Sequence, residues 1–177
     1  MTERKSLELK GAIFEIMIAD YLRTNFPECE IVHNITIPSR TLKKGNTQVD
    51  VIMVCEQAII VIEAKDWSKQ IRGLRKEAVW HGLGNNPSGM TVVSPVRQNL
   101  HHIRMLKAKL LKEGLRTPQM SNLIVVPDSC EIKTDCDEVI SITDLKFNVN
   151  KVINSASRSV KQITGRDYRE IAKILRE

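Results

Sequence analysis

The chain has 177 residues, a length that fits one domain able to bury a hydrophobic core. Hydrophobic residues make up 42% of it and charged residues 27%, as in ordinary globular proteins, which excludes a disordered or fibrous chain. No apolar run approaches the roughly 18 residues of a membrane-spanning helix, and the first ten residues lack the apolar core of a signal peptide. We therefore expect a cytoplasmic protein that does not enter a membrane.

The formal net charge of +6 permits a polyanionic partner, although many basic proteins bind none. The four cysteines contain no CxxC pair, and a chain of this size does not need a disulfide framework. We expect reduced, mostly buried thiols and no zinc site at Cys29, Cys55, Cys130 and Cys136.

The first third of the chain contains one helical pattern and three strand patterns. Apolar residues recur at turn spacing from about Leu7 to Thr24, which predicts a helix that ends before Pro27. The run Glu30–Pro38 is typical of a strand. After a polar loop, two apolar runs rich in β-branched residues flank residues 55–58, and this pattern predicts an antiparallel hairpin.

The middle of the chain contains a helix with clear end signals. Residues 69–73 could extend the sheet, and residues 80–90 are expected to form a loop. Ser94 suits the N-cap and Pro95 the first helical position, and apolar spacing follows from there. Gly114 is the expected end of this helix.

Two short apolar runs and a helical tail complete the pattern, at residues 122–128, 138–145 and 167–177. The order of elements predicts an α/β fold, with a mixed β-sheet flanked by helices. We expect a single domain over residues 1–177, with a core at about 7–147 and a C-terminal helical extension at about 150–177.

Three charges stand inside the two apolar runs of the predicted hairpin. If residues 55–58 close the hairpin symmetrically, facing residues have numbers that add up to 113, so Asp50 lies opposite Glu63. Their Cβ atoms would then be roughly 4.5–5.5 Å apart on one face of the sheet. Strand alternation sends Lys65 to that same face. A register shift of one residue would separate the two carboxylates.

Two facing carboxylates destabilise a sheet unless a positive charge lies between them. A divalent cation fits, because hard cations prefer carboxylate oxygens. A metal with an ammonium beside it can polarise a phosphate, orient a water and offset charge on phosphorus, which phosphodiester hydrolysis requires. The alternative is that Asp50 caps a turn while Glu63 and Lys65 face solvent at an exposed edge.

The sequence resembles a known family through several motifs: "TQVDVIMV", "AIIVIEAKDW", Trp80 and "SPVRQNLHHI". Together they resemble the NERD (nuclease-related) domain, which is placed in the PD-(D/E)XK nuclease superfamily. The resemblance runs from about Lys10 to Leu110 and on to the "VISITDL" run, and it implies a restriction-endonuclease-like core. The superfamily's nominal Pro-Asp is Val49-Asp50 here, as is common in NERD sequences.

The resemblance implies roles for six residues. Asp50, Glu63 and the backbone carbonyl of Ala64 would hold Mg²⁺ or Mn²⁺, with Lys65 as the catalytic lysine. Glu15 matches a first-helix glutamate that the superfamily often adds, acting on the metal through water. Gln98 matches a glutamine on the helix after the motif, which would orient the water or contact phosphate. The alternative for Glu15 is an exposed helix residue without a catalytic role, and for Gln98 it is an ordinary residue at the N-terminus of a helix.

The expected substrate is DNA, with RNA left open, and the protein could act as a homodimer or within a larger complex. Base stacking by Trp67 is less favoured than hydrophobic support at the sheet edge. His101 and His102 are adjacent on a helix and cannot both face one metal. The rival function is a non-catalytic nucleic-acid-binding or regulatory module of a DNA repair or defence complex. The residues expected to contact nucleic acid are Lys43, Lys44, Arg72, Arg97, His102 and Arg104.

Overall fold

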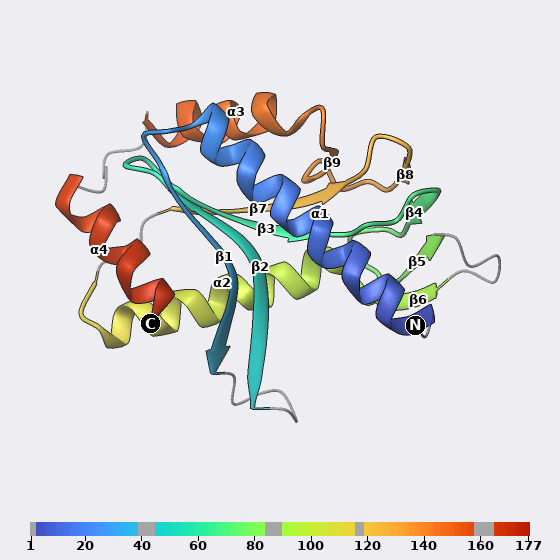
Figure 1. Cartoon of the computed structure of the whole chain (residues 1–177), viewed down its shortest axis with the longest axis horizontal. Coiled ribbons are helices and arrows are strands. Elements are labelled where there is room, and N and C mark those ends of the chain that lie inside the picture. The colour runs from blue at the N-terminus through green and yellow to red at the C-terminus, as the bar shows by residue number, and fades with distance from the viewer. Residues whose placement is uncertain (1–2, 39–44, 84–89, 116–118, 158–164) are drawn as a thin grey trace.

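A computed structural model describes residues 3–38, 45–83, 90–115, 119–157 and 165–177 (Figure 1). The helices are α1 (Glu3–Asn25), α2 (Pro95–Lys112), α3 (Leu145–Ser157) and α4 (Gly165–Arg176). The strands are β1 (Glu30–Pro38), β2 (Asn46–Val54), β3 (Ile59–Ala64), β4 (Gln70–Arg72), β5 (Val79–Leu83), β6 (Met90–Val93), β7 (Met120–Val126), β8 (Glu131–Lys133) and β9 (Val139–Ser141). None of the helices in these ranges has the length and apolar character needed to cross a bilayer.

The larger sheet has five strands in the order β1-β2-β3-β7-β9. β1, β2 and β3 are antiparallel to their neighbours along the chain, whereas β7 and β9 run parallel to β3. β3 up to Ile62 and the second half of β2, from Val51 to Val54, are continuously apolar because both faces of this sheet are covered by helices. The mixed sheet flanked by helices confirms the predicted α/β fold class.

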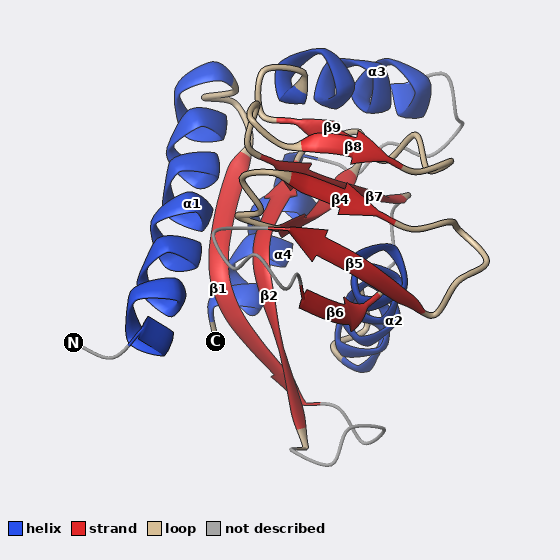
Figure 2. Ribbon diagram, turned by 90° about the vertical axis from the view of Figure 1, so that its right-hand side faces the viewer, coloured by secondary structure: helices blue, strands red, loops and turns tan. Residues whose placement is uncertain are grey.

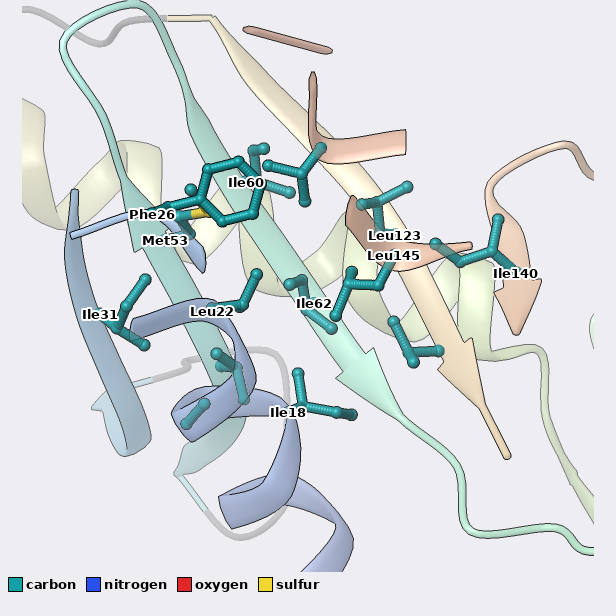
Figure 3. Packing of buried hydrophobic residues seen from close by; sticks show 14 of the residues in the cluster. Ile18, Leu22, Phe26, Ile31, Met53, Ile60, Ile62, Leu123, Ile140 and Leu145 are labelled. Atoms are coloured by element: carbon teal, nitrogen blue, oxygen red, sulfur yellow. The ribbon is translucent and has the colours of Figure 1, made fainter. Parts of the chain in front are cut away.

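Helices α1 and α3 cover one face of this sheet (Figure 2). Ile18 and Leu22, one turn apart on α1, pack in one cluster with Ile60 and Ile62 of β3 and with Leu145 of α3 (Figure 3). The spacing of four residues on the helix and two on the strand puts each pair on one face of its element. This cluster fixes the middle of α1 against the end of β3.

Helices α2 and α4 cover the opposite face. Ile103, Leu106 and Leu110 of α2 pack with Ile52 of β2 and Val61 of β3. The predicted start of α2 is confirmed, because the hydroxyl oxygen of Ser94 accepts a hydrogen bond from the backbone N–H of Arg97 at 3.4 Å. Its predicted end is confirmed too, since Gly114 has a positive φ of 74°.

A second, smaller sheet has the strand order β6-β5-β4-β8. It corrects two expectations. Residues 69–73 do not extend the larger sheet, and in the segment expected as a loop at 80–90 the described residues, 80–83 and 90, belong to β5 and β6, whereas residues 84–89 lie outside the described range. The physical reason is tryptophan packing. A Cβ on Gly73 would lie 2.2 Å from Cγ of Trp80, and a Cβ on Gly82 would lie 2.6 Å from Trp67. Both rings are buried, Trp67 included, which favours its predicted role as hydrophobic support.

Candidate active site

The hairpin of β2 and β3 has the predicted register. Val54 pairs with Ile59 and Val51 with Ile62, so facing residue numbers add up to 113 along the ladder. Cys55 N–H donates to the carbonyl of Ala58 at 2.9 Å and closes the turn symmetrically. Continuing the same register by one pair places Asp50 opposite Glu63.

A local distortion of β1 lies beside Asp50. Asn34 has φ 54°, and the pairs on either side of it, His33 with Val51 and Ile35 with Val49, bracket the position that faces Asp50. Asparagine tolerates this left-handed backbone better than most residues. The ladder is therefore interrupted next to the first carboxylate, where a regular strand would have continued the pairing.

A pocket of about 410 Å³ opens where β3 ends. α1 enters it from one face of the sheet through Glu15, and α2 from the other through Gln98. The lining is mostly polar and includes all six residues that the resemblance implies as ligands or catalytic groups. The complete lining is Glu15, Asn46, Thr47, Gln48, Asp50, Glu63, Ala64, Lys65 and Gln98.

Glu63 is the most deeply buried carboxylate of the pocket, with 1% of it exposed. Its Oε1 accepts a hydrogen bond from the ammonium of Lys65, and its Oε2 lies 3.4 Å from Nδ1 of His102. Burial raises the pKa of Glu63 to about 8; Asp50 adds to the rise, and Lys65 opposes it. Without further positive charge this carboxyl holds a proton at neutral pH.

The pKa values of Asp50 and Glu15 are raised as well. Burial raises the pKa of Asp50, although its Oδ2 accepts a hydrogen bond from the N–H of Ala64 at 2.8 Å. Glu15 is half-buried, and desolvation together with the charge of Asp50 raises its pKa to about 7. Three acidic groups thus share a region whose positive charge within the pocket lining comes from Lys65.

Among the residues expected to contact nucleic acid, Arg72, Arg97, His102 and Arg104 lie outside this pocket lining. Arg72 and Arg104 are exposed, on β4 and α2. Arg97 is exposed as well, and its Nη2 donates to the carbonyl of Lys76 at 2.8 Å, so it holds a neighbouring loop. Lys43 and Lys44 lie outside the described residues.

The predicted phosphate contact of His102 is wrong. Only 1% of this residue is exposed, and its ring lies behind Glu63 on the protein side, away from solvent. Helical spacing correctly placed it one turn from Gln98, on the side of α2 that faces the sheet. At that depth the ring contacts a site carboxylate and not the substrate. Burial also lowers the pKa of His102 to about 4, so the ring is neutral.

Sequence reasoning missed two groups of residues around the pocket. Asn99 is fully buried, and its Nδ2 donates to the carbonyl of Val61 at 2.8 Å and to Oδ1 of Asn122 at 2.7 Å, which ties α2 to β3 and β7. Thr47 and Gln48 line the pocket ahead of Asp50. The "TQ" and "RQN" motifs contain all of these positions, so the signal was present but was not assigned a role.

The donor set suits a hard divalent cation bound by few protein ligands. No set of three or more His, Cys, Asp or Glu side chains in the described ranges is arranged to hold a metal ion. Two carboxylates fit Mg²⁺, which commonly keeps several waters and binds substrate phosphate oxygens as well. Oε2 of Glu63 is buried without a hydrogen-bond partner in the described structure, and the raised pKa values of both carboxyls indicate a deficit of positive charge. The residues present therefore fit such an ion.

Comparisons with known proteins bear on the family. A solved structure, that of Pyrococcus furiosus SfsA in complex with Ca²⁺, aligns with 85% of this chain and 53% of its own at 13% identity, with a TM-score of 0.28. The chain thus spans about half the length of that protein, and the likeness is too low to support an argument. No curated protein matches the chain. The model of the nuclease-related domain matches residues 10–127, which is more than half of the sequence. The chain belongs to the NERD (nuclease-related domain) family.

Proposed function

We propose that the protein is a metal-dependent nuclease that hydrolyses phosphodiester bonds of DNA. The observation that carries this proposal is that Asp50 lines the same pocket as a buried Glu63 whose Oε1 contacts Lys65. A sheet interior tolerates two facing carboxylates poorly, so their placement at the mouth of a polar pocket needs a chemical reason. Holding a cation against an anionic substrate supplies that reason.

Asp50 and Glu63 would hold Mg²⁺ or Mn²⁺, with the carbonyl of Ala64 as a third ligand and Glu15 acting through a water. When bound, such an ion polarises a phosphate oxygen and lowers the pKa of a bound water. Asp50 is already oriented for this task, because the N–H of Ala64 fixes its Oδ2 at 2.8 Å. Charge from the cation would favour the ionised forms of both carboxyls and offset the rise that burial causes in their pKa values.

Lys65 supplies the positive charge of the pocket lining. Its side chain is 20% exposed, so its ammonium can reach the pocket while still contacting Oε1 of Glu63. With Glu63 and Asp50 holding a cation, the ammonium of Lys65 would serve the substrate side of the pocket. There it would orient the attacking water and offset the charge that develops on phosphorus.

Gln98 and the exposed arginines would act on the nucleic acid. Gln98 reaches the pocket from the first turn of α2, where its amide can orient the water or contact a phosphate oxygen. Arg72 and Arg104, exposed on β4 and α2, would contact the backbone without reading sequence. With Lys43, Lys44 and Arg97 they would make binding strongly salt-dependent.

A cleavage assay tests the proposal. Plasmid, linear duplex, single-stranded DNA and RNA are each incubated with the protein and Mg²⁺, Mn²⁺ or EDTA, beside Glu63→Ala and Lys65→Ala. The proposal expects cleavage of at least one DNA substrate with metal, none in EDTA, and a large loss in both variants. Cleavage that survives both substitutions or persists in EDTA would contradict it. DNA binding without cleavage under either metal would favour a non-catalytic nucleic-acid-binding module.

A further inference from the structure

Two buried polar atoms without hydrogen-bond partners face each other in this molecule. Among the described residues, three buried side-chain atoms lack a partner, and two of them are Oε2 of Glu63 and Nδ1 of His102. These two atoms are 3.4 Å apart, and each of the two side chains is 1% exposed. A buried polar atom without a hydrogen-bond partner costs free energy. Two such atoms this close together therefore indicate that they are partners of each other.

The chemistry of the two groups determines which of them donates when Glu63 is ionised. A carboxylate only accepts hydrogen bonds, and a neutral imidazole has one N–H to give. Lys65 already donates to Oε1, so Oε2 is the oxygen that needs a donor. Nδ1 of His102 is the polar atom beside it. A shortening of the 3.4 Å distance by a few tenths of an ångström gives an ordinary hydrogen bond.

His102 acts on Glu63 and not on the substrate, because it does not line the pocket. Gln98 lies one turn earlier on the same side of α2 and does line it. On one face of this helix, Gln98 therefore lines the pocket, and His102, one turn later, contacts Glu63 without lining the pocket. Asn99 ties the same helix turn to β3, which holds α2 at a fixed distance from Glu63.

We propose that His102 is a positioning residue that donates Nδ1–H to Oε2 of Glu63 and thereby holds Oε1 toward the pocket. This inference rests on the proposed function, in which Glu63 binds a divalent cation. A second hydrogen bond fixes the plane of the carboxylate, and partners of this kind commonly change metal affinity or activity by 10–100-fold when removed.

The test compares two substitutions of His102. His102→Asn keeps an N–H donor close to the position of Nδ1, whereas His102→Leu removes it. His81→Asn, an exposed site on β5, is the control. Mn²⁺ affinity is measured by calorimetry, and kcat and KM on the DNA that the wild type cleaves. We expect His102→Leu to weaken Mn²⁺ binding by about 10–100-fold and to lower kcat with KM little changed, and His102→Asn to recover most of both losses.

A second measurement does not depend on metal or cleavage. Nitrogen-15 NMR of the metal-free protein, recorded at a pH above the folded-state pKa of Glu63 of about 8 so that its carboxyl is ionised, reports which ring nitrogen of His102 carries the proton. We expect Nδ1–H, with a resonance that shifts in Glu63→Gln. An Nε2–H ring, a His102→Leu variant with wild-type Mn²⁺ affinity, or a His102→Asn variant no better than His102→Leu would each overturn the inference. If the wild type binds Mn²⁺ but cuts no nucleic acid, only the proposed function fails, and the affinity comparison still decides the role of His102.

Discussion

Val51 lies directly opposite Ile62 in the antiparallel ladder of β2 and β3. Their apolar side chains belong to the core under α1, and continuing the register by one position toward the open end of the hairpin places Asp50 opposite Glu63. The position of the site is thus set by backbone pairing that a dry core stabilises. The two carboxylates at the polar pocket therefore lie one position beyond a hydrophobic pair of the same hairpin.

Removal of Lys65 should separate catalysis from metal binding. Because the ammonium of Lys65 occupies Oε1 of Glu63, Lys65→Ala removes a competitor for the cation. We expect Mn²⁺ affinity to stay the same or rise, while kcat falls by about 10²–10⁴-fold through loss of charge stabilisation and proton handling. Calorimetry and single-turnover kinetics measure the two effects. A parallel loss of Mn²⁺ affinity would show that Lys65 shapes the metal site.

The metal-free protein should lose stability as pH rises from about 5 to 9. The folded-state pKa of Glu63, about 8, lies above its usual value of 4.5, so the folded protein holds a proton in this window that the unfolded chain has released. Stability then falls with pH by up to about 1.4 kcal/mol per unit from this group, and the loss is complete above the folded-state pKa. Glu15, with a pKa of about 7, adds in the same direction. His102, whose pKa is lowered from 6.5 to about 4, opposes this fall up to about pH 6.5, so the steepest loss of stability is expected above that pH.

Thermal unfolding at several pH values measures this predicted loss of stability with rising pH. Glu63→Gln should flatten the fall, and Mg²⁺ should raise the Tm of the wild type more at pH 9 than at pH 6, since binding requires the ionised carboxyl. The control is Glu56→Gln, the same change at an exposed position in the turn of the same hairpin. A wild-type profile that rises between pH 5 and 9 would contradict the buried, protonated state of Glu63.

Gly73→Ala should destabilise the second sheet. A Cβ there would lie 2.2 Å from Cγ of Trp80, whose ring is fully buried and cannot move aside. The expected loss is about 1–3 kcal/mol or more, as for other overpacked cores. Gly11→Ala is the matched control, because a Cβ there meets nothing within 4 Å and alanine favours the helix α1. Urea unfolding that gives equal free energies for the two variants would refute this packing.

Arg72 and Arg104 should contribute to nucleic-acid binding through charge alone. Each loses one phosphate contact when replaced by alanine, so affinity should fall for all sequences alike and the salt slope should drop by about 1 per residue. Lys151→Ala, at an exposed position on α3, is the control. Fluorescence anisotropy over a series of salt concentrations measures the slope. If the salt dependence of affinity is unchanged in both arginine variants, the nucleic-acid-binding surface lies elsewhere on the protein.

The hairpin and the position of its carboxylates could be predicted because they depend on local rules. Strand alternation and a four-residue turn determine the pairing of Asp50 with Glu63 once the turn closes symmetrically. The start of α2 was equally predictable, since Ser94 and Pro95 are local signals. The approach of Glu15 from α1 depends on packing across the sheet, and it came from family resemblance alone.

The second sheet and the depth of His102 could not be predicted because both depend on distant contacts. β4 and β8 have three residues each and pair across about sixty residues of sequence, as Gln70 with Glu131 shows. Such short strands have little periodicity of their own. For His102, helical spacing gave the correct face of α2 but not its distance from solvent, so a buried neighbour of Glu63 was assigned to the substrate.

Mn²⁺ binding by Asp50→Asn and Glu63→Gln tests the central claim most directly. Each substitution keeps the shape of the side chain and removes one negative charge, and Glu56→Gln in the same hairpin is the control. Electron paramagnetic resonance or calorimetry counts the bound ions. The account predicts one Mn²⁺ bound by the wild type and by Glu56→Gln, and at least about a 10-fold weaker affinity in each of the other two variants. Wild-type affinity in both Asp50→Asn and Glu63→Gln would contradict it.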